Sequence, residues 1–236
     1  MTPQVKSRVR VQDHGEVFTN EREVNAMLDM VKQETHRIDS RFLEPACGNG
    51  SFLAEVLSRK LAVVRSRYRR SLFEYEKCAF IAIGSIYGVG ILADNTQERR
   101  DGLYGIVEGD YLPVCKKNPT PKFLDAIRFV IEKNILWGNA LSLKAVDRSG
   151  ANTNEPIIFC EWSIVGDKVK RCDYRLDEML EGSASQTQFS LFGASGTPTS
   201  EWELDEETGA VIPKPIREYP IISIYEVGQY ESHRLP

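Results

Sequence analysis

The sequence predicts an α/β fold, with a mostly parallel sheet, helices on both faces, a C-terminal β-hairpin and a flexible tail. Apolar runs with strand character alternate with helical patterns up to residue 165, and such alternation is typical of parallel sheets covered by helices. The 236 residues are 42% hydrophobic and 27% charged, so they can bury the core of one domain. The composition changes near residue 182, where the periodic part ends.

The chain begins with a polar segment and an amphipathic helix. Asn20, with Glu23 three residues further on, has the pattern of a helix N-cap. The apolar residues that follow at i, i+3, i+4 and i+7 spacing are Val24, Met27, Leu28 and Val31. Residues 41–46 predict a short strand that ends in the turn Cys-Gly-Asn-Gly-Ser. A long helix is expected over residues 52–75, followed by a second helix that ends near Gly84.

Two more buried strands are predicted over residues 85–92 and 134–141, because both runs are apolar. Helices are predicted over residues 94–107 and 122–133. The loop expected between these helices contains three prolines, which are Pro113, Pro119 and Pro121.

A fourth strand is predicted over residues 155–165, and a tight turn at Gly166–Asp167 continues it into a β-hairpin. We expect the main domain to cover residues 1–181. Residues 182–209 are rich in Gly, Ser, Thr, Gln and acids, which predicts a flexible linker. Residues 210–236 are expected to be an extended segment that packs back on the domain and contains an edge strand, IISIYEV.

The charge and the cysteines exclude several classes of protein. Thirty Lys and Arg against 34 Asp and Glu give a net charge of −4, so binding of nucleic acid through bulk charge is not expected. A local basic face is still compatible with this net charge. No apolar run reaches the roughly 18 residues of a membrane span, and the start has no signal-peptide core. We therefore expect a cytoplasmic protein without a membrane partner. The five cysteines and three histidines lack the close spacing of metal ligands, which predicts reduced thiols and no metal.

The most informative segment is the turn after the first strand, within FLEPACGNGSFL at residues 42–53. Gly48 and Gly50 permit positive φ and let a ligand approach the backbone closely. Glu44 at the end of the strand suits a cationic or amine-bearing ligand and would repel a phosphate. The Gly-Lys-Ser/Thr ending of a phosphate-binding loop is also missing.

The segment EPACGNGSFL resembles the first motif of the S-adenosylmethionine-dependent, adenine-N6 DNA methyltransferases of restriction–modification systems. Three further segments resemble elements of that family in the right order: GEVFT before the first helix, IYGVGILADN and ILWGNAL. The resemblance covers about residues 8–165. It implies an incomplete Rossmann-like methyltransferase fold, S-adenosylmethionine as cofactor, and DNA or a restriction–modification subunit as partner.

The resemblance also implies a set of cofactor-binding residues. Glu44 would contact the methionine amine, Thr19 would close over the same end, and Ile91 would pack on the adenine, unless Ile91 is plain core. The set implied by the resemblance is Thr19, Glu44, Ala46, Gly48, Asn49, Gly50, Ile91 and Asn139.

The sequence departs from the family at four places. Gly90 stands where an acid normally binds the ribose hydroxyls, and this loss would weaken cofactor binding about ten- to a hundredfold. Asn139 replaces the acid that accepts from the adenine amino group, and Asn20 replaces a proline. The catalytic tetrapeptide Asn/Asp-Pro-Pro-Tyr/Phe is missing, so we identify no catalytic residue. Glu161 and Trp162 stand at its place as weak candidates, with core or edge positions as the alternative.

These departures leave two main hypotheses. The first is a DNA adenine-N6 methyltransferase-like protein of a restriction–modification or mobile-element system, weak or inactive alone, because too few residues remain after the fourth strand for the rest of the family fold. The alternative is a non-catalytic methyltransferase-fold binding protein that acts through DNA, a defence complex or the sliding clamp. A small-molecule methyltransferase is a third, weaker hypothesis.

Two segments suggest interactions. The helix over residues 59–70 has six basic residues, of which Arg59, Arg67 and Arg70 share a face that could follow a phosphate backbone or simply be solvated. The peptide QFSLF resembles the motif by which bacterial DNA-processing proteins bind the sliding clamp, with Gln188, Leu191 and Phe192 as its key residues. Its apolar residues would otherwise dock on the chain's own surface.

Overall fold

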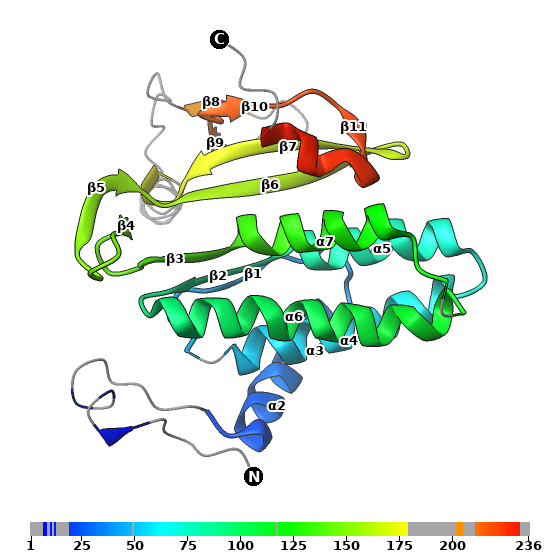
Figure 1. The fold of residues 1–236 in the computed structure, drawn as a ribbon, viewed down its shortest axis with the longest axis horizontal. Helices are drawn as coiled ribbons and strands as arrows, with labels where there is room; N and C mark the ends of the chain where they lie inside the picture. The colour runs from blue at the N-terminus through cyan, green and yellow to red at the C-terminus, as the bar shows by residue number, and fades with distance from the viewer. Residues whose placement is uncertain are drawn as a thin grey trace, which may run out of the picture.

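The computed structural model describes residues 7, 8, 10, 12, 19–48, 50–116, 118–178, 202–204 and 211–231. Figure 1 shows the arrangement of the elements. The helices are α2 (Glu21–Met30), α3 (Lys32–Thr35), α4 (Ser51–Tyr68), α5 (Leu72–Gly84), α6 (Ala93–Val114), α7 (Pro121–Asn134) and the 3-10 helix η1 (Ile224–Glu231). The strands are β1 (Phe42–Glu44), β2 (Ile86–Gly90), β3 (Ile135–Asn139), β4 (Lys144–Val146), β5 (Asn152–Pro156), β6 (Ile158–Val165), β7 (Lys168–Arg175), β8 (Trp202–Leu204), β9 (Val211–Pro213), β10 (Arg217–Glu218) and β11 (Ile222–Ser223).

The main sheet has five strands in the order β1-β2-β3-β4-β5. The pairs β1–β2 and β2–β3 are parallel, whereas β4 and β5 continue the sheet in antiparallel pairs. The predicted α/β class is therefore confirmed, and the parallel part comprises three strands. Only Ser85 separates α5 from β2, and α7 runs directly into β3, so these helices prolong their strands in Figure 1.

The two faces of the parallel strands are covered differently. Gly88 of β2 faces α4, where a Cβ atom would come within 2.8 Å of Leu53. On the opposite face, Tyr87 and Val89 pack against Ile157 and Phe159. The prediction of helices on both faces is therefore wrong, because a second sheet covers one of them. In this sheet, β7 pairs with β6, β10 and β11.

The fourth predicted strand does not join the parallel sheet. β6 pairs with β7 in an antiparallel hairpin over eight residues, and Gly166 in the connecting turn has a φ of 64°. The predicted hairpin is thus confirmed, whereas the predicted place of its first strand is wrong. The β4–β5 hairpin, which the sequence analysis missed, redirects the chain before β6 begins.

Three predicted boundaries need correction. The long helix ends at Tyr68, and Ser71 caps a new helix by accepting a hydrogen bond from the Glu74 amide. Pro113 lies in the last turn of α6 instead of in a loop. Only the first part of the IISIYEV segment is strand, because η1 begins at Ile224. There the buried residues Ile224, Val227 and Tyr230 recur every three residues, which is the period of a 3-10 helix.

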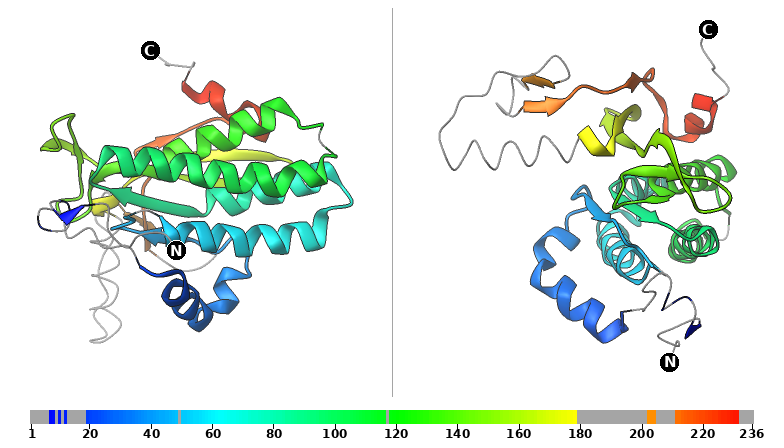
Figure 2. Two further views of the ribbon diagram at one scale, coloured as in Figure 1. Left: turned by 60° about the horizontal axis from the view of Figure 1, so that its bottom comes forward. Right: turned by 90° about the vertical axis from the view of Figure 1, so that its left-hand side faces the viewer.

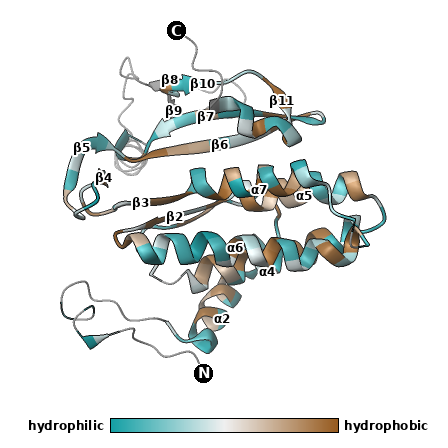
Figure 3. Cartoon of the chain, in the orientation of Figure 1, coloured by the Kyte–Doolittle hydropathy of each residue, from teal (hydrophilic) through white to brown (hydrophobic). Residues whose placement is uncertain are grey.

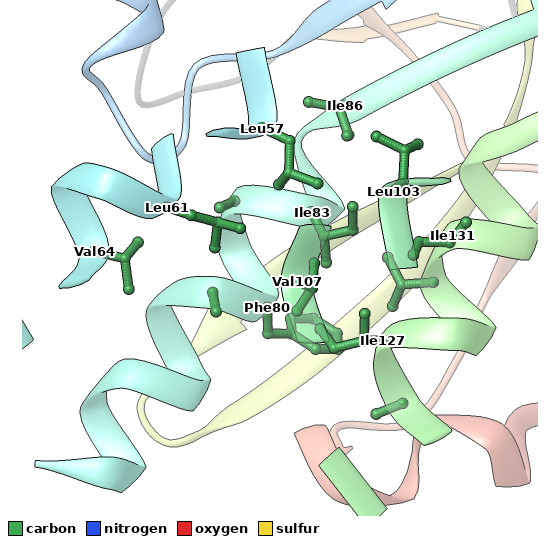
Figure 4. Close-up of a cluster of buried hydrophobic side chains, with 14 of the residues drawn as sticks. Leu57, Leu61, Val64, Phe80, Ile83, Ile86, Leu103, Val107, Ile127 and Ile131 are labelled. Atoms are coloured by element: carbon green, nitrogen blue, oxygen red, sulfur yellow. The ribbon is translucent and has the colours of Figure 1, made fainter. Parts of the chain in front are cut away.

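The predicted first helix is confirmed as α2, with Asn20 as its N-cap. Figure 2 (right) shows α2 on the outer side of α4, to which Asn25 and Arg59 link it by a 2.8 Å hydrogen bond. Hydrophobic residues line the inner sides of the helices in Figure 3. The centre of the core, shown in Figure 4, is formed by Leu57, Leu61, Val64, Phe80, Ile83, Ile86, Leu103, Val107, Ile127 and Ile131.

The C-terminal segment packs on the rest of the domain. β10 and β11 pair with β7, and η1 lies against α7 (Figure 1). Most of the predicted linker over residues 182–209 lies outside the described residues, apart from β8, and so does the clamp-like peptide with Gln188, Leu191 and Phe192. Among the described helices, none has the length and apolar character that crossing a bilayer requires.

Candidate functional site

The predicted turn lies at the carboxyl ends of the parallel strands. The chain leaves β1 at Glu44, and the Cys47 amide donates a 3.1 Å hydrogen bond to the Val89 carbonyl of β2. Because β1, β2 and β3 are parallel, Glu44, Gly90 and Asn139 all stand at the same edge of the sheet. Open α/β sheets bind their ligands at this edge, so the turn lies at the edge where such sheets place a ligand.

The turn itself is shaped by its glycines and by Glu44. Gly48 and Gly50 have φ values of 31° and 78°, and Gly50 is the N-cap of α4 without a capping side chain. The Glu44 carboxylate instead accepts a hydrogen bond from the amide of Leu53 in the first turn of α4. A carboxylate is favourable at the positive end of a helix dipole. Glu44 therefore has a structural task in addition to any ligand contact.

The space beside the turn is filled by an arginine from α6. Arg99 is only 3% exposed, and its Nη2 donates a hydrogen bond to the Gly48 carbonyl. A Cβ atom on Gly50 would lie 2.5 Å from Cγ and 2.8 Å from Cδ of Arg99. A Cβ atom on Gly90 would lie 3.0 Å from Nη1 and 3.1 Å from Nη2. The Arg99 side chain therefore packs against the backbone of both glycines.

The charges in this site are incompletely paired. Burial raises the pKa of Glu44 to about 7, although the Leu53 amide and the positive charge of Arg99 act in the opposite direction. Within the described part of the chain, Oε2 of Glu44 and Nε and Nη1 of Arg99 are buried without a hydrogen-bond partner. Such orphaned polar atoms usually indicate a missing water, a ligand or a strained arrangement.

Cys47, in the middle of the turn, is chemically quiet. Its Sγ donates to the Val89 carbonyl at 2.9 Å. Burial raises the pKa of the thiol to about 12, which makes it a weak nucleophile at neutral pH. Among the described residues, no group of three His, Cys, Asp or Glu side chains could hold a metal ion.

The other predicted cofactor residues lie around the same edge with varied surroundings. Ile91 follows β2 and is 39% exposed. Asn139 organises the β3–β4 turn, because its Oδ1 accepts a 3.0 Å hydrogen bond from the Leu141 amide and its Nδ2 donates to Asn152. Thr19 is half-buried just before α2, Ala46 is exposed, and Asn49 lies outside the described residues.

The two catalytic candidates lie at the opposite ends of the strands. Trp162 donates its Nε1–H to Oδ1 of Asn134, the residue immediately before β3, at 2.9 Å. Glu161 forms an ion pair with Arg41, the residue immediately before β1. Both therefore stand near the amino edge of the parallel strands. The fold does not bring them together with the Glu44 turn.

The three residues of the predicted basic face differ in exposure and in ion pairing. Arg59 is engaged by Asp29 and Glu55, each at 2.8 Å, and its side chain is mostly buried. Arg67 and Arg70 are exposed at the carboxyl end of α4. Only the latter two are free to contact a large ligand such as DNA.

As folded, the site does not fit S-adenosylmethionine, because Arg99 occupies the space beside Gly50 and Gly90. Sequence reasoning missed this residue. The one signal available was the coincidence of Gly90, where the family has an acid, with a basic residue in the following helix. Comparisons with protein-family models, with curated proteins and with solved structures find no match to this chain.

Proposed function

We propose that this chain is a methyltransferase-like protein of the DNA adenine-N6 type that does not transfer methyl groups by itself and acts by binding. The ancestry is supported by EPACGNGSFL, which stands in a strand–turn–helix unit at the carboxyl edge of parallel strands. Its partners would be DNA, a restriction–modification or other defence complex, or the sliding clamp.

The observation that carries the proposal is the place of Glu161 and Trp162. Methylation of a base requires the target amine and the methyl donor to meet in one site. The candidates from the fourth predicted strand lie beside Arg41 and Asn134 at the amino edge, one strand length from Glu44. A methyl donor at Glu44 would therefore be out of their reach.

A second candidate function is a methyltransferase that a partner chain completes. In doubly wound sheets the strand order 3-2-1 continues beyond the first strand. Here β1 is the edge of the main sheet among the described strands, and its Leu43 is 43% exposed. A partner strand beside β1 would extend the sheet and could bring the missing tetrapeptide to the carboxyl edge.

The test is transfer of a tritiated methyl group from S-adenosylmethionine to unmethylated DNA of mixed sequence, with an active adenine methyltransferase as positive control. We expect the purified chain to give no incorporation above the protein-free blank. Incorporation that is lost in Glu44→Gln would contradict the proposal. The variants Glu161→Gln and Trp162→Phe should give the same background incorporation as wild type.

A further inference from the structure

Arg99 is more than a neighbour of the glycine-rich turn, because it lies where a ligand would lie. We propose that Arg99 is the built-in occupant of a site for a compact organic cation, formed by Glu44, Gly48, Gly50 and Gly90. In the folded chain the arginine holds this site closed, and a ligand cation must displace it. This inference deepens the proposed function and rests on it only where S-adenosylmethionine is the ligand.

The first argument is space. Gly50 and Gly90 come from different elements, yet a Cβ atom on Gly50 would collide with Arg99 and a Cβ atom on Gly90 would make a tight contact with the same arginine. At Gly90 a Cβ atom would also meet Oγ1 of Thr96 at 3.1 Å. The two glycines thus provide the room that the Arg99 side chain fills. The same room would accommodate a ligand of similar size if the arginine left.

The second argument is charge. The site has one carboxylate, Glu44, which is partly buried and whose Oε2 lacks a hydrogen-bond partner among the described residues. A buried carboxylate is stable only with a compensating cation or with a proton. Arg99 supplies the positive charge that acts on Glu44. A ligand with an ammonium, sulfonium or guanidinium group would supply the same charge.

The third argument is that Arg99 is held weakly for a buried arginine. Arg171 is equally buried at 4% exposure, but it forms a bidentate ion pair with Asp173 at 2.7 and 3.0 Å and stacks on Tyr219 at 4.3 Å. Arg99 donates one hydrogen bond to a carbonyl, and two of its nitrogens, Nε and Nη1, have no partner among the described residues, against one, Nη1, in Arg171. An arginine placed for structure alone would resemble Arg171.

The experiment is chemical complementation of Arg99→Ala. Ethylguanidinium at low millimolar concentration should raise the thermal midpoint of this variant by several degrees and leave wild type unchanged. The double variant Glu44→Gln/Arg99→Ala should lose most of that shift. Arg37→Ala, which removes exposed pairs with Glu34 and Asp39, is the control for nonspecific effects and should not respond. Equal responses in all four proteins would overturn the inference.

S-adenosylmethionine is titrated into the same proteins by calorimetry. We expect no heat of binding with wild type and binding to Arg99→Ala that requires Glu44. Binding to wild type as tight as to Arg99→Ala would overturn the inference. Rescue by ethylguanidinium without binding of S-adenosylmethionine would support the cation site and contradict the methyltransferase-like proposal. No ligand response of either kind in Arg99→Ala would overturn the inference.

If Arg99→Ala does not fold, a double-mutant cycle replaces it. The variants are Glu44→Gln, Arg99→Gln and the two combined, and the measurement is the midpoint of urea unfolding. The inference predicts that Arg99→Gln is less destabilising in the Glu44→Gln background, because the carboxylate no longer needs a cation. Additive effects of the two substitutions would contradict it.

Discussion

At the scale of one residue, Lys60 is a buried amine whose hydrogen-bond partners are all uncharged oxygens. It is fully buried in α4, and its Nζ lies 3.2 Å from the Ile38 carbonyl and 2.5 Å from Oγ of Ser85. A third contact joins Nζ to the Ser40 carbonyl. None of these partners carries a charge. Burial accordingly lowers the pKa of Lys60 from 10.5 to about 7.

This lowered pKa predicts a pH dependence of stability. Between pH 7 and 10.5 the folded protein has released the Lys60 proton while the unfolded chain keeps it. Stability therefore rises with pH through this window, because the unfolded state binds more protons. Lys60→Met should remove that contribution. It should also cost about 2–4 kcal/mol at pH 9, because Nζ no longer satisfies the buried carbonyls.

The measurement for Lys60 is the free energy of urea unfolding from pH 7 to 10 in both proteins. The difference between wild type and Lys60→Met should widen as the pH rises, whereas tyrosine and cysteine titrations affect both proteins alike. Arg37→Met, an exposed cation in the same region, is the control. A constant difference across the range would show that Lys60 stays charged when folded.

The Glu44 turn illustrates what residue patterns can and cannot predict. The sequence located the turn because a strand, two glycines and a helix start are local features. It could not predict Arg99, which is 51 residues away from Gly48 along the chain. The packing of α6 on α4 determines that contact, and no spacing rule reports it.

At the scale of elements, some basic residues of α4 form ion pairs within the chain, and others are exposed near the end of the helix. Arg59 and Arg65 are engaged by carboxylates of the same chain. Arg67 and Arg70, at the carboxyl end of the helix, are exposed. Cations at this end stabilise the helix dipole, and they also form the one part of the predicted DNA-binding face that is accessible.

If this end of α4 contacts DNA, Arg67→Ala/Arg70→Ala should weaken binding to duplexes of any sequence. Each lost phosphate contact should also reduce the slope of log K against log salt by about 0.9. The measurement is fluorescence anisotropy at several salt concentrations. The matched control is Lys144→Ala/Arg148→Ala, two exposed cations on or next to β4 at the opposite end of the molecule in Figure 1. Equal losses in both double variants would contradict a specific role for α4.

The boundaries of helices and strands could not all be predicted from the local hydrophobic pattern. The apolar period continues through residues 52–75, and the local sign of a break at Arg69–Ser71 is the capping-box spacing of Ser71 and Glu74, which the sequence analysis missed. The turn becomes necessary because α5 must run back along α4 to deliver β2 beside β1. Likewise, IISIYEV is rich in the branched residues typical of strands, but Ile224, Val227 and Tyr230 of η1 are buried in the core at 3-10 spacing.

At the scale of the whole molecule, the second sheet is the feature that sequence patterns could not predict. A fourth apolar strand is compatible with either sheet, because strand character does not identify the pairing partner. The β4–β5 hairpin decides the outcome by redirecting the chain. β6 then crosses α5 and α7 as part of a separate layer (Figure 1).

Trp162 links this layer to the helices. Its ring lies 5.8 Å from Phe80, 6.2 Å from Phe129 and 6.5 Å from Tyr230 of η1, measured between centroids. A Cβ atom on Gly84 would come within 3.3 Å of it. One side chain thus joins α5, α7, β6 and the C-terminal segment.

Trp162 is partly buried, so we expect Trp162→Ala to destabilise the protein by about 3 kcal/mol, the lower end of the range for buried aromatic deletions. Trp162→Phe keeps most of the packing and should cost less, mainly the hydrogen bond to Asn134, which is worth about 1 kcal/mol. Urea unfolding followed by circular dichroism measures both. Trp137→Ala, at the carboxyl edge, is the control and should cost less than Trp162→Ala, because Trp137 does not join the two layers. A fully stable Trp162→Ala variant that had lost DNA binding would instead assign this tryptophan to base stacking.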